Sequence, residues 1–349
     1  MILPQSPAAV LFLMILSLLC WGSWANTYKL AGKWRYEIYY FDFALGVVIA
    51  AFIYAFTVGN LGFDGFSFMD DLMHAGKRQW LYGFMGGVIF NLANMILLGA
   101  ISVAGMAVAF PIGMGVAIIV GTILAYAAKA AGNPVLLFAG CALIAAAVVA
   151  AALAYRFHAI LKHETVARAG KAASTRRPSS IKGTVLALVS GLLMGSFFPL
   201  VDSARAGDVG LGPYAVAAVF AVGIFVSTFV FNVFLMNLPV EGEPLEVLDL
   251  FKSTPKEHLL GLEGGALWCT GMVASLAAGS AAAEIQVGGV AGYFLAQGSA
   301  LIAALWGILL WKEFKAADLR VKTLVVLMFL LFAGGLLVIA QASLYVRPV

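Results

Sequence analysis

The chain has 349 residues, of which 63% are hydrophobic and only 11% are charged, and its formal net charge is +4. Soluble domains carry about 25% charged residues, so this composition excludes a soluble protein. The small positive charge gives no indication of a nucleic-acid partner. The sequence therefore predicts a multi-pass integral protein of the cell membrane, with the lipid bilayer as its surroundings.

Ten apolar segments are long enough to cross the membrane as helices, since one crossing takes about 20 residues. The expected helices cover 7–29, 41–60, 80–101, 103–127, 134–156, 181–202, 213–237, 258–281, 285–311 and 321–344. The apolar runs are continuous rather than alternating, which argues against membrane-spanning strands. The sequence thus predicts an all-α membrane protein with ten transmembrane helices.

The distribution of Lys and Arg predicts how the helices are oriented, because cytoplasmic loops are enriched in these residues. If the amino-terminus lies outside, the cytoplasmic loops carry 16 of the 21 basic residues. We therefore expect both termini outside and the basic segment 156–182 in the cytoplasm.

The second half of the chain repeats motifs of the first half. The segment "SLLCWGSW" at 17–24 matches "SGLLMGSF" at 190–197, and "GFMGGVIFNLANM" at 83–95 matches "GLEGGALWCTGMV" at 261–273. Four such pairs follow one another in the same order, at offsets that grow slowly from 173 to 194. Apolar sequence gives single matches by chance, but an ordered series predicts an internal repeat.

We expect a first five-helix repeat over 1–156, a basic cytoplasmic linker over 157–180 and a second five-helix repeat over 181–349. Because five is odd, equivalent helices cross the membrane in opposite directions. Inverted repeats of this kind are typical of secondary transporters, which bind their solute near the midplane between the halves. The sequence contains no HExxH or GxSxG motif, so we do not expect an enzyme.

Several motifs resemble those of the ureide permeases, a group of the drug/metabolite transporter superfamily close to its glucose/ribose and rhamnose porters. They are "GSW" ending the first expected helix, "YYFDF" opening the second, "GGVIFNLAN" in the third, "VGTILAY" in the fourth and "LWGILLWKEF" closing the ninth. The resemblance implies proton-coupled uptake of a small polar, largely uncharged solute such as allantoin or uracil by alternating access. A sugar porter is the alternative, and a metabolite exporter or a channel is more remote.

Plant members of this family carry a phosphate-loop-like sequence in the central loop. Here that loop reads "TVARAGKAAS", with Thr165 in place of the first glycine and Ala172 after Lys171 in place of Ser or Thr. Such a loop lacks the glycine and the magnesium-binding hydroxyl of a nucleotide cradle, so we expect no cofactor. The sequence leaves open whether the protein is a monomer or a homodimer.

Asn91 and Asn94 lie one turn apart in the middle of the expected helix 80–101. An amide without a partner in hydrocarbon costs roughly 2–7 kcal/mol, so both side chains must face protein or a wet cavity. They are candidates for binding an imide or ureide edge, and the alternative is hydrogen bonding between helices.

One stripe of the first expected helix carries polar and aromatic residues at i, i+4, i+7 and i+11, namely Ser17, Trp21, Trp24 and Tyr28. A tryptophan near a helix end is often an interface anchor. Trp24, however, has Phe197 as its repeat partner, and an aromatic residue in both halves suits two walls around a flat ligand. We expect Trp24 to stack on the solute and Asn26 to make a polar contact.

The expected helix 285–311 presents Gln286, Tyr293 and Gln297 on one face. Tyr293 and Gln297 are candidates for solute contact, with structural hydrogen bonds as the alternative. Trp268 and Thr270 in the expected helix 258–281 are candidate wall residues.

Glu263 and Asp42 are the candidates for proton coupling. Glu263 is the one carboxylate well inside an expected span, and a charge at depth marks function by default. Glu263 could instead reach water at the nearby helix end. Asp42 could simply stabilise the start of its helix. No metal site is expected, since the histidines all fall in loops or at span ends.

Overall fold

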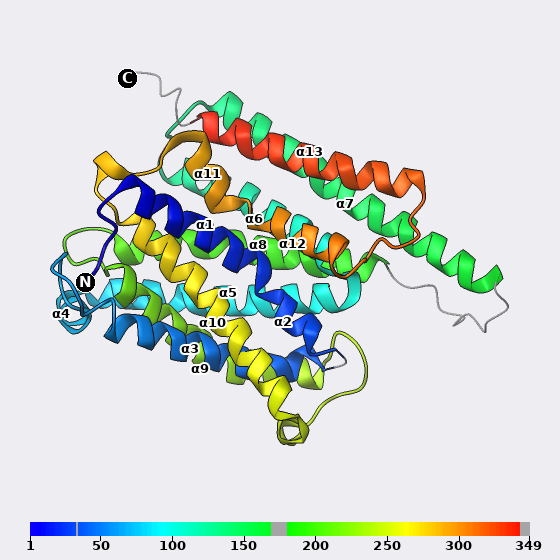
Figure 1. Cartoon of the computed structure of the whole chain (residues 1–349), viewed down its shortest axis with the longest axis horizontal. Helices are drawn as coiled ribbons and strands as arrows, with labels where there is room; N and C mark the ends of the chain where they lie inside the picture. The colour runs from blue at the N-terminus through cyan, green and yellow to red at the C-terminus, as the bar shows by residue number, and fades with distance from the viewer. Residues whose placement is uncertain (33, 169–179, 343–349) are drawn as a thin grey trace. The chain divides into compact units, whose positions relative to one another are not determined.

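The computed structural model describes residues 1–349 except 33, 169–179 and 343–349 (Figure 1). Within this described part every regular element is a helix. In chain order they are α1 (Pro7–Ser23), α2 (Ala25–Leu30), α3 (Tyr36–Phe56), α4 (Phe68–His74), α5 (Lys77–Ala104), α6 (Met106–Ala128), α7 (Pro134–Arg168), α8 (Ser180–Arg205), α9 (Pro213–Asn237), η1 (Val247–Lys252), α10 (Pro255–Gly279), η2 (Ala283–Ile285), α11 (Gly289–Gln297), α12 (Ser299–Leu309) and α13 (Leu319–Ala342).

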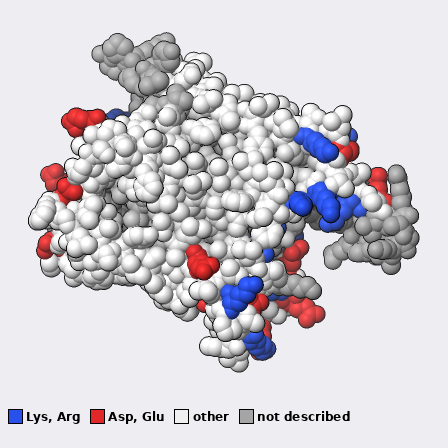
Figure 2. Space-filling model, in the orientation of Figure 1, with Lys and Arg blue, Asp and Glu red and all other residues white. Residues whose placement is uncertain are grey.

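Nine helical spans in the described residues are long and apolar enough to cross a membrane, with α1 and α2 together forming the first. A tenth is formed if α11 and α12 are counted as one broken span. Figure 2 shows the matching surface, on which charged side chains are sparse and wide areas carry none. The predicted all-helical membrane architecture is confirmed, and the described residues hold nine or ten candidate spans against the ten that were predicted.

Most helix ends lie within a few residues of the predicted ones, and three of the expected helices are instead interrupted or much longer than predicted. The first expected helix is interrupted at Trp24, between α1 and α2. The ninth is broken at Gly298 with a bend of 54°, and glycine is the weakest helix former after proline. The fifth, α7, continues to Arg168 and has 35 residues. At 1.5 Å per residue it is about 52 Å long, whereas the hydrocarbon core is about 30 Å thick.

The central loop expected to lack a nucleotide site falls largely outside the described residues, including Lys171 and Ala172. Thr165 is still part of α7 and donates its hydroxyl hydrogen to Leu161 O, 2.8 Å away. That hydrogen bond belongs to ordinary helix, so Thr165 is not in a loop.

The chain forms two compact units. Unit 1 comprises Met1–Met95 and Ser196–Ser299, and unit 2 comprises Ile96–Gly195 and Ala300–Val349. Each unit takes helices from both halves of the sequence. The units group residues that contact one another, which does not test whether the two halves of the sequence repeat one another. The predicted boundaries at 1–156, 157–180 and 181–349 therefore stay a prediction.

In unit 2, α7 packs along α13 and against α6, and Figure 1 shows α7 and α13 side by side. The start of α6 is capped by a side chain that is remote in sequence. Both carboxylate oxygens of Glu313 accept backbone hydrogen bonds, from Met106 N at 2.9 Å and Ala107 N at 2.8 Å. A carboxylate at a helix N-terminus satisfies free N–H groups and interacts favourably with the helix dipole.

In unit 1, α10 packs against α1 and α3, and α3 packs against α9. Glycines allow the backbones of α3 and α10 to touch. A Cβ added at Gly46 would collide with Leu262 O, and one added at Gly265 would collide with Phe43 O. Small residues that bring backbones together are how membrane helices associate without a hydrophobic driving force between them.

The same contact occurs a second time, between α5 and α9. A Cβ added at Gly223 would collide with Phe84 O, and one added at Gly87 would collide with Phe220 O. In the numbering of the chain, each of these four residues lies 177 or 178 positions from its counterpart in the α3–α10 contact. Two copies of one backbone contact therefore organise unit 1.

We expect Gly265→Ala to destabilise the purified protein, because the added methyl group has no room beside Phe43 O. Forcing a methyl group into a packed contact costs about 1–3 kcal/mol. The matched control is Gly334→Ala in α13, where a Cβ meets nothing within 4 Å. Thermal unfolding in detergent measures the difference, and equal melting temperatures for the two variants would contradict the glycine contact.

Candidate functional site

Six aromatic side chains of unit 1 form three ring pairs, which are Trp24–Phe43, Phe90–Trp268 and Phe197–Phe220. Their ring centroids are 5.0, 4.3 and 5.7 Å apart, respectively. We call these six residues the aromatic cluster. Trp268 also stacks on Phe220, with an angle of 14° between the ring planes. The cluster joins α2 and α3 to one another and α5 to α8, α9 and α10.

The pairs can be compared with the predicted internal repeat. Trp24 and Phe197 are predicted repeat partners; Trp24 packs on Phe43 and Phe197 packs on Phe220, which lies 177 positions after Phe43. The third pair joins Phe90 directly to Trp268, 178 positions later in the chain. The predicted partner residues thus make corresponding ring contacts, and the aromatic walls around a solute stay a prediction.

Asn91 is fully buried, and its amide joins α5 to α9. The amide nitrogen donates to Ser227 Oγ at 2.8 Å and to Thr228 Oγ1 at 3.1 Å. The Ser227 hydroxyl donates to Gly223 O, so its oxygen is an acceptor for the amide. The Thr228 hydroxyl lies within donating distance of both Ile224 O, at 2.8 Å, and the Asn91 amide oxygen, at 3.4 Å. The side chain of Asn91 therefore makes the interhelical bonds that were the alternative to solute binding.

The close approach of the helices creates this bond. Asn91 lies one turn after Gly87, and Ser227 lies one turn after Gly223, the two glycines at which α5 and α9 touch. Residues four apart occupy the same face of a helix. The amide and the hydroxyls consequently meet just beyond the backbone contact.

Asn94 has a different partner from Asn91. Its amide nitrogen donates to Tyr40 Oη at 3.1 Å, and that hydroxyl donates to the backbone oxygen of Asn91 at 3.4 Å. The Tyr40 ring lies 5.0 Å from the Phe43 ring. Asn94 is thus connected through Tyr40 to the aromatic cluster.

A second tyrosine of α3 ties this helix to α2 and α10. The Thr27 hydroxyl donates to Trp24 O at 2.8 Å, which leaves its oxygen to accept from Tyr39 Oη at 2.7 Å. Gly264 of α10 allows the approach, since a Cβ there would collide with both oxygens. Sequence reasoning missed Thr27, Tyr39 and Tyr40, although "YYFDF" was noted as a motif.

Asp42 forms a hydrogen bond with His258 that links α3 to α10. Its Oδ2 lies 2.7 Å from His258 Nδ1, and the side chains are 13% and 32% exposed, respectively. The Trp34 and His258 rings lie edge to face, with their centroids 5.8 Å apart. His258 was not predicted as a site residue. Glu263, the other predicted proton-coupling residue, is exposed on α10.

The remaining predicted residues are dispersed. Thr270 Oγ1 forms a hydrogen bond of 2.9 Å with Tyr54 Oη, and both residues line an apolar groove between α1, α3 and α10. Trp268, by contrast, packs on the ring of Phe90. The amide nitrogen of Asn26, in α2, donates to Ser23 O at the end of α1, 2.9 Å away. Tyr293 and Gln297 are half-buried on α11, which packs against α1.

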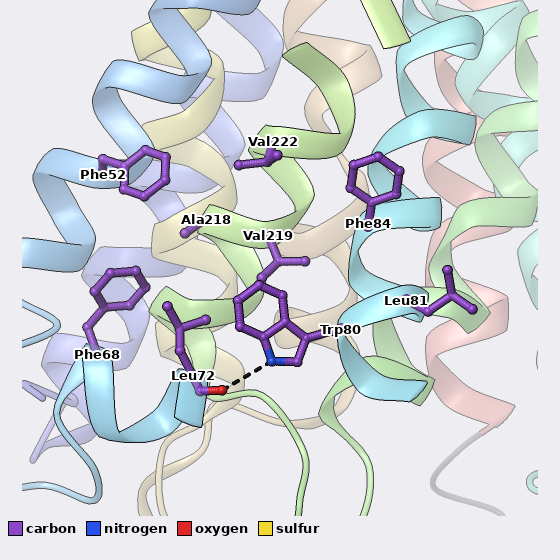
Figure 3. Close-up of a pocket in the computed structure, with 9 residues that line it drawn as sticks. All are labelled: Phe52, Phe68, Leu72, Trp80, Leu81, Phe84, Ala218, Val219 and Val222. Carbon is purple, nitrogen blue, oxygen red and sulfur yellow. Dashed lines mark hydrogen bonds between the residues drawn. The ribbon is translucent and has the colours of Figure 1, made fainter. Parts of the chain in front are cut away.

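A separate cavity of about 380 Å³ in unit 1 is apolar (Figure 3). Its lining residues come from α3, α4, α5 and α9, and they are Phe52, Phe68, Leu72, Trp80, Leu81, Phe84, Ala218, Val219 and Val222. The one polar side-chain group among them, the Trp80 N–H, donates to Leu72 O at 3.1 Å. This cavity suits a hydrocarbon chain and offers nothing to a polar solute.

Within the part of the chain that the structure describes, no group of three or more His, Cys, Asp or Glu side chains is placed to hold a metal ion. The groups that converge in unit 1 are instead aromatic rings, amides and hydroxyls. Such groups bind by stacking and hydrogen bonding, and they suit a flat neutral molecule.

Known proteins with similar sequences agree with this chemistry. The model of the ureide permease family matches residues 39–187. Ureide permease 1 of Arabidopsis thaliana is 23% identical, with 97% of this chain and 98% of the relative covered. Ureide permease 4 of the same plant is 24% identical, with the same coverage of each chain. The chain is similar to ureide permeases over nearly its whole length.

This similarity, with the nine apolar spans among the described residues, indicates a multi-pass integral membrane protein and a transporter rather than an enzyme. One crystal structure, titled only as that of a protein, shares the fold with a TM-score of 0.51 at 14% identity. The match covers 95% of this chain and 96% of the other.

We expect Asn91→Ala to lower the melting temperature of the solute-free protein. The variant removes the donor that satisfies two buried hydroxyl oxygens, and such a loss costs about 1–3 kcal/mol. Asn237→Ala is the control, because that exposed amide donates to Val233 O in its own helix, 2.8 Å away. A melting temperature for Asn91→Ala equal to that of the wild type would show that the α5–α9 bond contributes nothing.

Proposed function

We propose that this protein transports a small polar, largely uncharged solute of the ureide or nucleobase class, with allantoin and uracil as the first compounds to test. The similarity to three ureide permeases over at least 97% of the chain carries the proposal. Because the matching curated relatives bear that name, a sugar porter is not favoured.

The aromatic cluster supplies the surfaces for such a solute. Indole rings provide large flat faces; the Trp24 ring packs on Phe43 and the Trp268 ring on Phe90. Asn94 supplies an amide that the Tyr40 hydroxyl positions, and the Tyr40 ring packs on Phe43. Asn91 has the role of holding α5 against α9, so we assign solute contact to Asn94 before Asn91. Asn26, Thr270, Tyr293 and Gln297 remain proposed contacts.

The duplicated helix contact supports two inverted five-helix halves. Repeat-related residues form the α3–α10 and α5–α9 contacts, and Phe90 stacks on its own repeat partner, Trp268. Side chains that touch their own repeat equivalents lie on the axis relating two copies. Two such halves can exchange conformations, which would expose one site to each side of the membrane in turn.

The Asp42–His258 pair supports proton coupling better than Glu263 does. Two ionisable groups 2.7 Å apart share a proton when one is bound, and their packing links α3 to α10. Within the described residues, the exposed Glu263 forms no salt bridge. We therefore propose that proton uptake at Asp42 and His258 accompanies uptake of the solute.

Uptake of labelled allantoin and uracil into proteoliposomes tests the proposed class. We expect saturable uptake that unlabelled ureides or nucleobases inhibit and that glucose, ribose and rhamnose do not. Trp24→Ala should reduce kcat/KM roughly tenfold, because loss of a stacking face costs about 1.4 kcal/mol. Trp80→Ala, in the apolar cavity, should keep wild-type uptake.

Three outcomes would contradict the proposal. Full competition by sugars would identify a sugar porter, and non-saturating electrogenic flux would identify a channel. Efflux without uptake under either orientation of the proton gradient would identify an exporter.

The pH dependence of uptake separates the two carboxylates. Because the proton is taken up with the solute, wild-type uptake should rise as the external pH falls from about 8 to about 5. Asp42→Asn should make uptake nearly independent of pH, and His258→Gln should shift the profile. Glu263→Gln should retain the wild-type profile. If uptake by Glu263→Gln were independent of pH while uptake by Asp42→Asn kept the wild-type pH dependence, Glu263 and not Asp42 would be the proton-coupling residue.

A further inference from the structure

A small cavity in unit 1 lies between α1, α10, η2 and α11, and we call it the α1–α11 pocket. Its volume is about 230 Å³. Three polar side chains line it, namely Ser17, Ser275 and Gln286, together with apolar residues that include Met14 and Ala296. None of the residues that line it is acidic or basic.

The hydroxyl of Ser17 is unsatisfied. Its side chain is 2% exposed, and its oxygen has no hydrogen-bond partner among the described residues. Other hydroxyls in the helices of unit 1 donate to the carbonyl one turn earlier, as Thr270 and Ser280 do. A buried polar group without a partner is rare and costly, so Ser17 is placed to bond something in the pocket.

A second unsatisfied donor follows on the next turn of α1. The indole N–H of Trp21 is buried and has no partner among the described residues. It lies against Gly271 of α10, where an added Cβ would be 2.9 Å from the indole nitrogen. Ser275 lies one turn after Gly271 on α10. Two consecutive turns of α1 thus present unsatisfied donors towards the same helix.

These donors belong to the stripe of α1 that leads to Trp24. Trp24 lies seven residues after Ser17, which is about 10 Å along a helix. Trp21 lies between them. A polar molecule bound at Ser17 in the α1–α11 pocket would therefore lie about two helical turns from Trp24, a member of the aromatic cluster.

The rim of the pocket adds further polar groups. Gln286 Nε2 donates to Ala281 O at 2.9 Å, which fixes this side chain at the wall. The Arg205 guanidinium donates to Ser280 Oγ at 2.7 Å and lies beside Gly279, another wall residue. The surroundings therefore favour a molecule with hydrogen-bond acceptors.

The size and chemistry of the pocket limit its occupant. A volume of 230 Å³ equals about eight water molecules at roughly 30 Å³ each, which suits a single small ring. A hydrocarbon chain would leave the Ser17 hydroxyl unsatisfied. An ion would lack a charged partner among the wall residues, since the Arg205 guanidinium lies at the rim and donates to Ser280 Oγ. A neutral molecule rich in carbonyl groups fits both conditions.

We propose that the α1–α11 pocket is a second solute site, which binds a neutral, carbonyl-rich small molecule before it reaches the aromatic cluster. The assignment rests on the proposed function, since it takes the same class of solute. Ser17 and Ser275 donate to its carbonyl groups, and Met14 and Ala296 contact its ring.

Transport kinetics and equilibrium dialysis with labelled allantoin and uracil test the site. Ser17→Ala should raise KM five- to tenfold with little change in Vmax, and should leave the melting temperature of the solute-free protein unchanged or higher. Ala296→Phe should fill the pocket and reduce the number of bound solutes from two to one. The control is Ser203→Ala, whose hydroxyl donates to Pro199 O in its own helix.

The outcomes separate this inference from the proposed function. If the wild type takes up solute saturably but both pocket variants keep its KM and its stoichiometry, the second site is wrong and the transported class stands. A lower melting temperature for Ser17→Ala, with unchanged stoichiometry in Ala296→Phe, would assign Ser17 a structural role only. If the wild type neither binds nor takes up either compound, the proposed function fails and the second site fails with it.

Discussion

The close approach of helix backbones at glycine determines where unit 1 places its polar side chains. In hydrocarbon no water satisfies an amide or a hydroxyl, so each must find a partner inside the protein. Gly87 and Gly223 let α5 and α9 touch, and one turn later Asn91 reaches Ser227 across the contact. Without that approach, a side chain as short as asparagine could not bridge two helices.

The two copies of this contact carry different chemistry. On the α5 side the turn after the glycine holds Asn91, whereas the repeat-equivalent position on α10 holds Cys269, which is buried and apolar in character. Tyr40 corresponds in the same way to Ala217. A nearly symmetric backbone frame thus carries a one-sided set of hydrogen-bonding groups. Rings come from both halves of the chain, whereas the buried amides Asn91 and Asn94 come from the first half alone.

The sequence predicts the spans well, because the length of an apolar run is a local property that needs no knowledge of neighbours. It predicts partners poorly. Asn91 and Asn94 look alike in sequence, yet one bonds α9 and the other Tyr40. Asp42 and His258 are 216 positions apart, so no local pattern could pair them. The extension of α7 to Arg168 was also missed, since its last turns are polar and resemble a loop.

The bond between Asn91 and its two hydroxyl partners also restricts which residue can occupy position 91. The Ser227 hydroxyl donates to backbone carbonyls of α9, so its oxygen accepts from the Asn91 amide, whereas Thr228 Oγ1 also lies within donating distance of the Asn91 amide oxygen, at 3.4 Å. Aspartate has nearly the same shape as asparagine, but it would replace the amide nitrogen and its hydrogens with a second oxygen. A substitution that is conservative by volume would therefore place an oxygen against Ser227 Oγ and remove the hydrogen bond that joins the two helices there.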